Sequence, residues 1–331
     1  MKSIPLAVEM DRQGIKYQIY NPCQHYDFNM SKIFEHEFNL KNIHHGHRKE
    51  KNPVKNIQEM IREFETYVKK SKHKIKGVFV VGDVNASLAC AIVSYKHDIP
   101  VIHIEAGLRS FDISMPEELN RITIDHVSSI LLAHCQDAVN NLKDENITRG
   151  VYMVGNLGID SLYKILLKNN YTRFKYYKKI LVTIHRRENL NHIDRLESIL
   201  QELDDISKYF DVIFPLHPHT KRKIKCGKNI KFIKPLGYMD FIKLLSKSAA
   251  VITDSGGIQE ETTFMGIPCF TVRDNTERPI TITQGTNMLV KPDNIFIKLL
   301  KHKDKEYKVP HLWDGHTAGR IINVLRKEKL I

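Results

Sequence analysis

Ionisable side chains end several apolar runs of this 331-residue sequence. Asp83 closes the run Gly77–Asp83, and Glu105 stands near the end of the run Val101–Gly107. Ligands of open α/β sheets bind beyond the carboxyl ends of the strands, and neighbouring parallel strands bring those ends together. We therefore predict that the two carboxylates emerge side by side at one crevice. Because His103 and Glu105 differ by two positions, we expect them to share a face of the sheet.

A third carboxylate, Glu117, follows a proline that is typical of a helix start. Proline at the first helical position and acids in the first turn both favour a helix beginning at Pro116, so we interpret Glu118 as a structural acid. Glu117 would be delivered to the mouth of the same crevice. Carboxylates gathered at a cleft raise one another's pKa, so that one can hold a proton while another accepts it. The pattern predicts acid–base chemistry, and the alternative is structural ion pairing with Arg109 and Arg121.

A histidine and a glycine turn end two apolar runs farther along the chain. The run Lys179–His185 stops at its histidine. A lone histidine is more often structural, but His185 would face the acids if the two halves of the chain meet mouth to mouth. Ser255, Gly256 and Gly257 follow a strand and open a helix, where free amides and a hydroxyl can bind a diphosphate. The alternative is a glycine turn that merely caps the helix.

Charged residues around that turn fit the rest of a nucleotide. Glu261, one turn into the helix, could accept hydrogen bonds from the two hydroxyls of a ribose. Arg273 and Arg278 come after the next strand and could neutralise phosphate charge. The turn is not a Walker loop, because no Gly-Lys-Ser/Thr follows it.

Short apolar runs alternate with amphipathic stretches, which is typical of parallel sheets with crossover helices. The length fits two domains, and the polar segment 169–179 resembles a linker between them. We therefore predict domains at 1–168 and 180–314, followed by a helical segment at 315–331. The predicted strands lie in Gly77–Asp83, Val101–Gly107, Tyr152–Asn156, Lys179–His185, Val212–His217, Ile230–Leu236 and Val251–Asp254. The predicted helices lie in Asn85–His97, Glu117–Val127, Gln136–Glu145, Ile159–Lys168, Ile193–Tyr209 and Asp240–Ser248.

Composition restricts the partners. The 51 Lys and Arg residues against 38 Asp and Glu residues give a net charge of +13, which suits anionic ligands. The lysines lack the aromatic interleaving of a nucleic-acid platform, so we predict no nucleic-acid partner. The five cysteines are widely spaced, which favours inert thiols in a reducing compartment. No apolar run could span a bilayer and the start has no leader-like pattern, so we expect a soluble, cytoplasmic protein without a membrane partner.

Taken together, the motifs resemble those of the UDP-N-acetylglucosamine 2-epimerase family, in its order and spacing over nearly the whole chain. The motifs are Gly82-Asp83, His103-Ile-Glu-Ala-Gly-Leu-Arg109, Pro116-Glu-Glu-Leu-Asn-Arg121, Thr183-Ile-His-Arg-Arg-Glu-Asn189, Asp254-Ser-Gly-Gly-Ile-Gln-Glu-Glu261 and Arg273-Asp-Asn-Thr-Glu-Arg-Pro279.

The resemblance implies an α/β fold with two Rossmann-like domains in the glycosyltransferase-B arrangement, an active site in the cleft between them, and UDP held mainly by the C-terminal domain. It implies reversible interconversion of UDP-N-acetylglucosamine and UDP-N-acetylmannosamine, by elimination of UDP and its re-addition, for surface-polysaccharide synthesis. No cofactor and no metal are required. A homodimer, and a C-terminal helix that returns to the N-terminal domain, are further implications.

The family's functional residues carry over to matching positions of this sequence. The catalytic acids and histidine would be Asp83, Glu105, Glu117 and His185. The nucleotide and sugar would be held by Lys2, Leu236, Phe241, Ser255, Gly256, Gly257, Glu261 and Arg278. Leu236 and Phe241 match the residues at the uracil. Gln24 and His25 resemble a pair that binds an activating second UDP-N-acetylglucosamine, although the following loop, 46–57, departs from the family pattern.

One departure concerns the N-terminus. The family begins with a strand ending in Gly-Thr-Arg-Pro-Glu, whereas this sequence starts just beyond it, at Met1-Lys2-Ser3. Our hypothesis is that the true start lies upstream. The alternatives to the favoured activity are a hydrolysing epimerase, an epimerase of a modified UDP-sugar, a glycosyltransferase of the same fold and an inactive UDP-sugar-binding protein.

Overall fold

The computed structural model describes residues 2–22, 43–46, 52–71, 75–169, 178–216, 229–302 and 306–331. Two compact units divide the chain: the first comprises Met1–Ser161 with His311–Ile331, and the second comprises Leu162–Pro310. The chain passes from the first unit to the second after Ser161, inside a helix and a few residues before the predicted boundary at 168. It returns to the first unit at His311, whereas the predicted C-terminal segment begins at 315. The predicted linker lies almost entirely outside the described residues.

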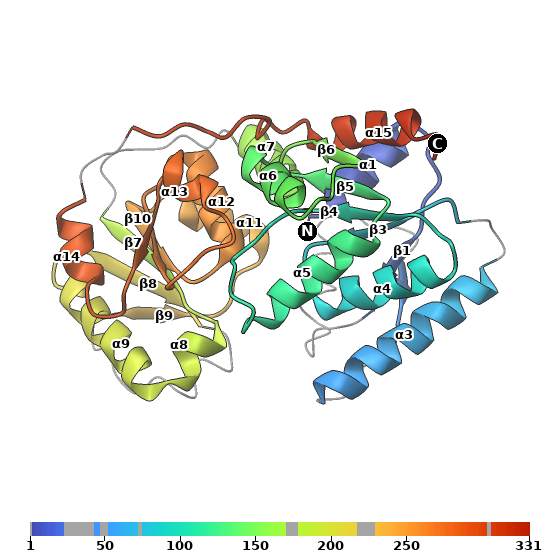
Figure 1. The fold of residues 1–331 in the computed structure, drawn as a ribbon. Coiled ribbons are helices and arrows are strands. Elements are labelled where there is room, and N and C mark those ends of the chain that lie inside the picture. The colour runs from blue at the N-terminus through green and yellow to red at the C-terminus, as the bar shows by residue number, and fades with distance from the viewer. Residues whose placement is uncertain are drawn as a thin grey trace. The chain divides into compact units, whose positions relative to one another are not determined.

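The first unit contains a four-stranded parallel sheet in the order β3-β4-β5-β6 (Figure 1) and a separate parallel pair, β1-β2. The strands are β1 (Ile19–Asn21), β2 (Ile43–His45), β3 (Val78–Val81), β4 (Val101–Ile104), β5 (Ile130–Ala133) and β6 (Val151–Met153). The helices are α1 (Ile4–Arg12), α3 (Pro53–Lys70), α4 (Asn85–Lys96), α5 (Pro116–Val127), α6 (Gln136–Asp144) and α15 (Thr317–Lys327), while α7 (Leu157–Asn169) begins in this unit and ends in the second.

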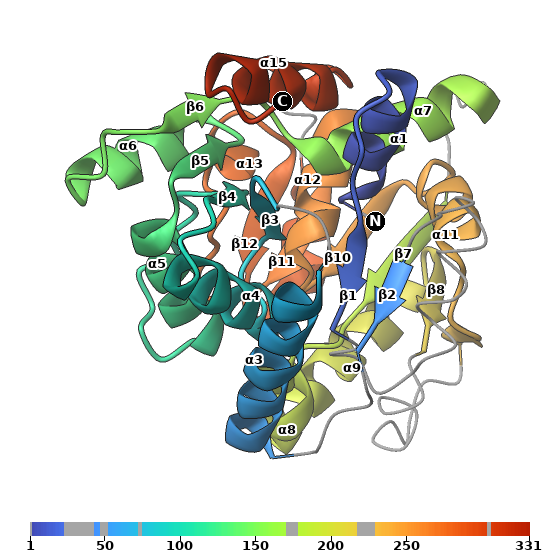
Figure 2. The same cartoon turned by 90° about the vertical axis from the view of Figure 1, so that its right-hand side faces the viewer.

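Alternating side chains of the central strands supply two cores, one on each face of this sheet. Ile102 and Ile104 of β4 pack with apolar residues of α1 and α15, which lie side by side although they come from opposite ends of the chain (Figure 1). Val101 of the same strand packs with residues of α3, α4 and α5, and Figure 2 shows α3 beside α4. Helices therefore cover both faces, as a parallel sheet requires.

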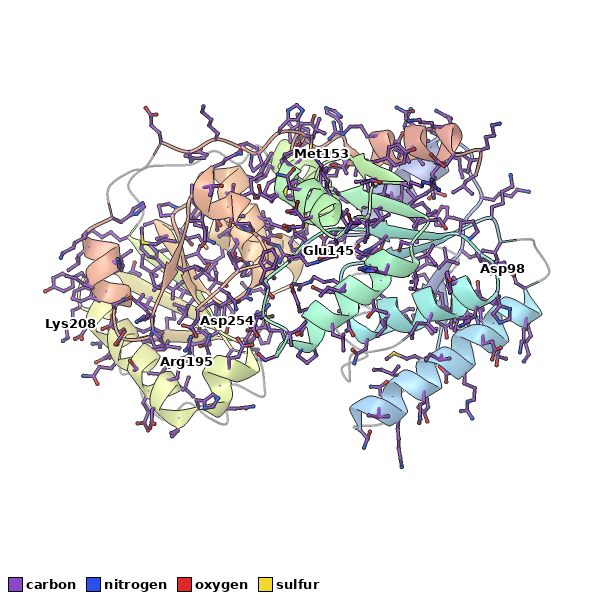
Figure 3. All side chains as sticks on the ribbon, in the orientation of Figure 1. Asp98, Glu145, Met153, Arg195, Lys208 and Asp254 are labelled. Atoms are coloured by element: carbon purple, nitrogen blue, oxygen red, sulfur yellow. The ribbon has the colours of Figure 1, made fainter. Side chains whose placement is uncertain are left out.

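Two helices of the first unit end with a residue in the left-handed conformation. Asp98 (φ 53°), labelled in Figure 3, follows α4, and Asn146 (φ 62°) follows α6. After each of them the chain folds back, with Ile99 N donating to Ser94 O at 2.9 Å and Ile147 N donating to Leu142 O at 2.8 Å. Asp and Asn tolerate this conformation better than other residues with a side chain, and the bond satisfies a carbonyl that the helix end would leave open.

The second unit is a six-stranded parallel sheet in the order β12-β11-β10-β7-β8-β9. The strands are β7 (Lys179–Thr183), β8 (Asp211–Pro215), β9 (Lys231–Ile233), β10 (Ala250–Thr253), β11 (Cys269–Val272) and β12 (Asn287–Val290). The helices are α8 (Arg187–Asn191), α9 (Ile193–Ser207), α11 (Tyr238–Leu245), α12 (Gly256–Met265), α13 (Ile280–Thr283) and α14 (Ile295–Leu300). This is the doubly wound Rossmann order, whose direction reverses between β7 and β10.

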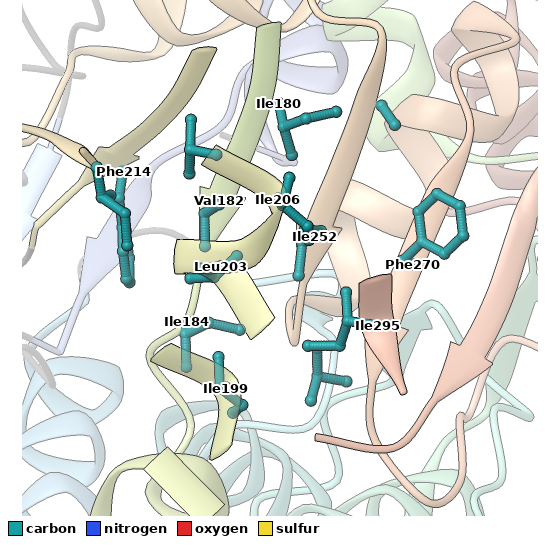
Figure 4. Packing of buried hydrophobic residues seen from close by; sticks show 14 of the residues in the cluster. Ile180, Val182, Ile184, Ile199, Leu203, Ile206, Phe214, Ile252, Phe270 and Ile295 are labelled. Carbon is teal, nitrogen blue, oxygen red and sulfur yellow. The ribbon is translucent and has the colours of Figure 1, made fainter. Parts of the chain in front are cut away.

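The core of the second unit lies under α9 and α14 (Figure 4). Val182 of β7 and Ile252 of β10 are fully buried there, against Leu203 of α9 and Ile295 of α14. β-branched residues suit such strands because their stiff side chains pack well on a pleated surface. The predicted α/β fold with Rossmann-like parallel sheets is confirmed.

Each predicted strand or helix segment overlaps a strand or helix of the structure, and β5, an interior strand of the first sheet, is among the elements that the sequence pattern misses. Its sequence, Ile130-Leu-Leu-Ala133, holds one β-branched residue and three residues that favour helices at least as much. All four side chains are buried at an interior position of the sheet, so tertiary packing rather than local preference makes this segment a strand.

Three cysteines of the described chain, Cys90, Cys135 and Cys269, are buried free thiols, as the sequence predicts. Burial raises the pKa of Cys90 to about 12 and that of Cys269 to about 11. Because the thiolate is the reactive form, these two thiols are inert at neutral pH. None of the described helices is long and apolar enough to cross a bilayer.

Candidate active site

The ends of β3 and β4 bring two predicted acids to neighbouring positions in the first unit. Val81 pairs with Ile104, and Gly82 N donates to Ile104 O at 3.0 Å, so Asp83 and Glu105 both follow directly from paired strand ends. A Cβ on Gly82 would lie 3.4 Å from Glu105 Oε2. The structure therefore places these two strand ends together, as parallel pairing predicts.

Glu105 leaves the strand in a left-handed conformation, with φ 72°. Such a conformation costs about 1–3 kcal/mol for a residue with a side chain and persists only where its surroundings hold it. Here Glu105 N donates to Leu132 O of β5 at 3.2 Å, and the carboxylate, whose side chain is 4% exposed, pairs with Lys2. Lys2 thus contacts one of the predicted catalytic acids.

The expectation that His103 and Glu105 share a sheet face is wrong. The two-residue alternation holds only within a strand, and β4 ends at Ile104, one residue before the left-handed Glu105. His103 Nδ1 lies 2.6 Å from Asp125 of α5, whereas Glu105 pairs with Lys2, which precedes α1. The two side chains therefore contact different helices.

Helix α5 holds the loop that carries Asp83. Arg121 Nε donates to Asp83 Oδ2 at 3.1 Å, and Asn120 Nδ2 donates to the Asp83 carbonyl at 2.9 Å. Arg121 also pairs with Glu118, which accepts from the backbone amides of Ser110 and Phe111. Glu118 is thus a structural acid, as its place in the first turn predicts.

Glu117 precedes this buried acid but is itself exposed. Among the described residues it makes no side-chain hydrogen bond or ion pair. The three predicted acids therefore have different surroundings, because Asp83 is paired with Arg121 and Glu105 with Lys2, whereas Glu117 carries no compensating charge. Structural ion pairing with a predicted catalytic acid is thus found for Arg121, which pairs with Asp83. Arg109 pairs instead with Asp125 and Glu145.

A buried ionic chain lies behind these strand ends. Asp125 accepts from Gly107 N at 3.1 Å and from Arg109 Nη1 at 2.7 Å, and Arg109 also donates to both carboxylate oxygens of Glu145, which Figure 3 labels. Burial alone would raise the pKa of Asp125, but the imidazole of His103 and the guanidinium of Arg109 hold it below its ordinary value. The ionised carboxylate therefore locks the turn after Glu105 to α5.

In the second unit, the ends of β7 and β10 place His185 beside Asp254, at the point where the strand order reverses. Fully buried Asp254 accepts from His185 N and Arg186 N at 3.1 and 2.9 Å, and from Asn189 Nδ2 at 3.0 Å. His185 Nδ1 lies 3.1 Å from Asp254 Oδ1, and the imidazole is 55% exposed. Because a carboxylate only accepts, Nδ1 carries the proton of this contact and Nε2 is available to a ligand.

Asn189 continues this network away from the turn. Its side-chain oxygen accepts from Arg195 Nε at 2.6 Å, and Figure 3 labels Arg195 and Asp254 in the second unit. Burial alone would raise the pKa of Asp254, but hydrogen bonds from His185, Asn189 and the Arg186 amide hold it below its ordinary value. Asp254 is therefore an ionised anchor for the His185 turn.

The predicted diphosphate turn opens α12. Ser255 is its N-cap, and Gly256 and Gly257 are its first residues. A Cβ on Gly256 would collide with the Arg278 guanidinium, whereas a Cβ on Gly257 would meet no atom within 4 Å. Only Gly256 is thus required by the chain itself, and the room beside Gly257 is open.

Arg278 lies against this turn but is largely neutralised. It is 5% exposed and donates to Glu260 at 2.7 Å and also to Glu277. Glu277 in turn accepts from Arg273 Nη1 at 2.8 Å. The predicted phosphate-binding arginine therefore belongs to a buried ionic cluster with Arg273, Glu260 and Glu277, in which carboxylates balance its charge.

The predicted base and ribose residues lie near the starts of α11 and α12. Leu236 immediately precedes the α11 N-cap, Gly237, and Phe241 lies in the first turn of α11; both side chains are partly buried. Glu261, one turn into α12, accepts from the Tyr238 hydroxyl at 2.8 Å. Burial, together with the Glu261 carboxylate, raises the pKa of Tyr238 far above its ordinary value.

Two of the predicted residues, Gln24 and His25, lie outside the described residues. The part of the chain that the structure describes contains no group of three His, Cys, Asp or Glu side chains that could hold a metal ion.

Several residues that hold the site were not singled out in the sequence. Asp125, Asn189 and Tyr238 are polar, buried and distant in sequence from the side chains they hold. The sequence marks Asp254 as the residue that follows a strand, but it does not show that Asp254 accepts hydrogen bonds from the His185 turn. A polar residue directly after a buried strand is the pattern that could have predicted this role. The partners of these groups come from other elements, and a single sequence does not show them.

Comparison with known proteins decides the family. A family model for UDP-N-acetylglucosamine 2-epimerase matches residues 8–326. The chain belongs to the UDP-N-acetylglucosamine 2-epimerase family. A UDP-N-acetylglucosamine 2-epimerase of Methanocaldococcus jannaschii is 36% identical over 98% of this chain and 95% of its own length. The family predicted from the motifs is therefore confirmed.

Solved structures agree with this membership. The M. jannaschii epimerase, in a crystal structure with UDP-N-acetylglucosamine and UDP, has a TM-score of 0.88 and 34% identity, covering 98% of this chain and 96% of that one. A Medicago truncatula protein solved with UDP-glucose has a TM-score of 0.58 at 11% identity, covering 98% and 90%. The second likeness shows the fold alone, which is the glycosyltransferase-B type.

Another relative of this family acts on a different sugar. The UDP-2,3-diacetamido-2,3-dideoxy-D-glucuronate 2-epimerase of Pseudomonas aeruginosa is 36% identical over 85% of this chain and 82% of its own length. Because this chain is 36% identical to both relatives, sequence identity alone does not show which of their two substrates it resembles more.

The buried anchor of the second unit predicts a pH-dependent stability difference. We expect Asp254→Asn to lower the free energy of unfolding by about 1–3 kcal/mol at pH 7, because the amides of His185 and Arg186 lose a charged acceptor. Since the folded pKa of Asp254 is depressed, its contribution is complete above the ordinary value of 3.8 and is lost as pH falls through the folded value.

Urea unfolding of both proteins between pH 7 and pH 2, followed by circular dichroism, measures this difference. The two unfolding curves should converge at the acid end. Asp211→Asn, at an exposed carboxylate of the same unit, serves as the control and should stay within about 0.5 kcal/mol of the wild type throughout. A gap that is constant with pH would contradict the assigned role.

Proposed function

We propose that this protein is an isomerase that interconverts UDP-N-acetylglucosamine and UDP-N-acetylmannosamine at sugar C2 without net hydrolysis. Family membership supports the reaction class. The observation that carries the proposal is the convergence of Asp83 and Glu105 at paired strand ends, each held by a cation from another element. A cytoplasmic location, a homodimer and a role in surface-polysaccharide synthesis belong to the same proposal.

The chemistry divides into two balanced steps. In the first, a carboxylate takes the C2 proton, the C1–O bond breaks, its electron pair leaves on the β-phosphate of UDP, and a C1–C2 double bond forms. In the second, a proton returns to C2 from the opposite face and a UDP oxygen re-forms the bond to C1. The C2 proton is not activated by an adjacent carbonyl, so the departing UDP must be stabilised while a base accepts the proton.

The first unit would supply the acid–base half. Asp83 and Glu105 are fixed by ion pairs with Arg121 and Lys2. Glu117 is exposed in the first turn of α5, where nothing in the described chain neutralises it. We assign the proton transfer at C2 to this acid set, with Glu117 as the member that forms no ion pair among the described residues.

The second unit would supply the leaving-group half. The exposed His185 imidazole, fixed through Nδ1 by Asp254, presents Nε2 as a donor to a phosphate oxygen when the imidazole is protonated. The free amides at the start of α12, beside Ser255 and Gly257, favour an anion there. We assign UDP binding to this turn, with Glu261 at the ribose and with Leu236 and Phe241 at the base.

A modified UDP-sugar is the second candidate substrate, and the P. aeruginosa relative favours its inclusion. Proton NMR in deuterium oxide tests both candidates with the full chain. UDP-N-acetylglucosamine should give the manno epimer, with deuterium entering C2 of substrate and product. Stoichiometric free UDP would indicate hydrolysis instead. Turnover of only the 2,3-diacetamido-glucuronate nucleotide would overturn the stated substrate.

Substitution of Glu117 tests the acid assignment. We expect Glu117→Gln to lower kcat by about 100- to 10,000-fold, because general acid–base groups contribute on this scale, while the melting temperature and UDP affinity stay unchanged. The NMR assay and calorimetry with UDP measure these quantities. Asp144→Asn, at an exposed carboxylate of the same unit, is the control. Equal activity of the two variants would remove Glu117 from the chemistry.

The open space beside Gly257 gives a test of the diphosphate turn. We expect Gly257→Ala to weaken UDP binding by roughly tenfold, about 1.4 kcal/mol, because the methyl group occupies room next to the free amides. Stability should be unchanged or higher by about 0.5–1 kcal/mol, since alanine suits a helix better than glycine.

Gly319→Ala is the matched control, because Gly319 also lies in the first turn of a helix, α15, with nothing within 4 Å of a Cβ. It should share any gain in stability and leave UDP binding unchanged. If Gly257→Ala bound UDP as the wild type does, the diphosphate would have to lie elsewhere.

A further inference from the structure

A buried tyrosine joins the two segments of the second unit assigned to the nucleoside. Tyr238 is the first residue of α11 and stands between Leu236 and Phe241 in sequence. Its side chain leaves that helix for the neighbouring one, where the hydroxyl donates to Glu261 Oε1 at 2.8 Å. One hydrogen bond therefore links the segment assigned to the base with the carboxylate assigned to the ribose.

The side chain of Tyr238 is buried, so its hydroxyl can hold another side chain in one position. The residue is 6% exposed, and Ile242 and Leu245 of the same helix are fully buried. Phe241 N donates to the carbonyl of Gly237 at 2.9 Å, which closes the first turn of α11. A tyrosine has two side-chain torsions, and burial of its ring leaves the hydroxyl in one place.

Glu261 gains most from this contact. A glutamate has three side-chain torsions, and ordering them when a ligand binds costs conformational entropy. Glu261 is only partly buried, and its carboxylate accepts the hydrogen bond from the Tyr238 hydroxyl. A hydrogen bond from Tyr238 reduces the entropy that the carboxylate loses on binding, which raises the affinity for a ligand that donates to it.

We propose that Tyr238 is a positioning residue that orients Glu261 toward the ribose hydroxyls and so sets the preference of this site for a ribonucleoside diphosphate over its deoxy counterpart. The inference rests on the proposed function, which supplies the UDP-sugar ligand and the place of Glu261. Tyr238 acts through Glu261 and does not itself touch the nucleotide.

A purely structural tyrosine would behave differently. If Tyr238 only filled space under α11, its loss would disturb the base site and weaken every uridine nucleotide equally. If it orients Glu261, its loss weakens only ligands that carry the ribose hydroxyls. The ratio of two affinities therefore separates the roles, and a general loss of folded protein does not change that ratio.

Calorimetric titration of the full chain with UDP and with 2′,3′-dideoxy-UDP measures this ratio. The wild type should prefer UDP by roughly 100-fold or more, because two hydrogen bonds to a charged group are lost with the hydroxyls. We expect Tyr238→Phe, which keeps the ring, to narrow the preference by roughly 3- to 10-fold. The dissociation constant of UDP should rise while that of 2′,3′-dideoxy-UDP stays constant.

Two further variants complete the test. Tyr209→Phe removes the hydroxyl of a tyrosine that is 64% exposed in the same unit and should leave the ratio unchanged. In a Glu261→Gln background, Tyr238→Phe should have no further effect on the ratio, because the two residues act as one unit. Equal weakening of both nucleotides by Tyr238→Phe would overturn the proposal.

The outcome is separable from that of the proposed reaction. A wild-type ratio near one would overturn the Tyr238 inference even in a chain that epimerises UDP-N-acetylglucosamine. The expected change of the ratio in a chain that shows no epimerisation would support the inference and count against the proposed reaction.

Discussion

Each unit of this protein keeps an ionised carboxylate almost completely buried beside the strand-end turns that hold the candidate site residues. Burial of an unpaired charge is very costly, so such a carboxylate persists only if it is surrounded by donors. Asp125 takes its donors from His103, Arg109 and Gly107, and Asp254 takes its donors from the His185 turn and Asn189. The donors are largely the residues that position the site, and the geometry of both strand-end turns depends on these two groups.

This constraint explains why the backbone near Glu105 is unusual. Glu105 and Gly107 both take left-handed conformations, and a Cβ on Gly107 would collide with the carbonyl of Ala138. Asp125 accepts from the Gly107 amide, so the turn is fixed on both sides of Ala106. The strained segment presents the Glu105 carboxylate to Lys2, and the packed surroundings offset the cost of the strain.

The sequence predicts the fold well because the apolar runs, their spacing and the glycine turns are local signals. The strand ends of Asp83, Glu105, His185 and Ser255 could be located by this means. The signal fails for β5, whose residues favour a helix as much as a strand, and for the partners Asp125 and Tyr238, whose roles depend on contacts over 20 residues or more. Such pairings follow from tertiary packing, which no local pattern contains.

The adjacent residues Glu117 and Glu118 have the same sequence context but different surroundings in the structure. Both lie in the first turn of α5, where the helix start favours any acid. Successive residues of a helix point about 100° apart, so one side chain turns inward to Arg121 and the Ser110 amide while the other faces outward. The helix start therefore predicts that an acid stands here, and only the packing decides which acid is structural. Because Glu118 already binds the loop and the arginine, Glu117 stays outside this ionic network and its side chain is exposed.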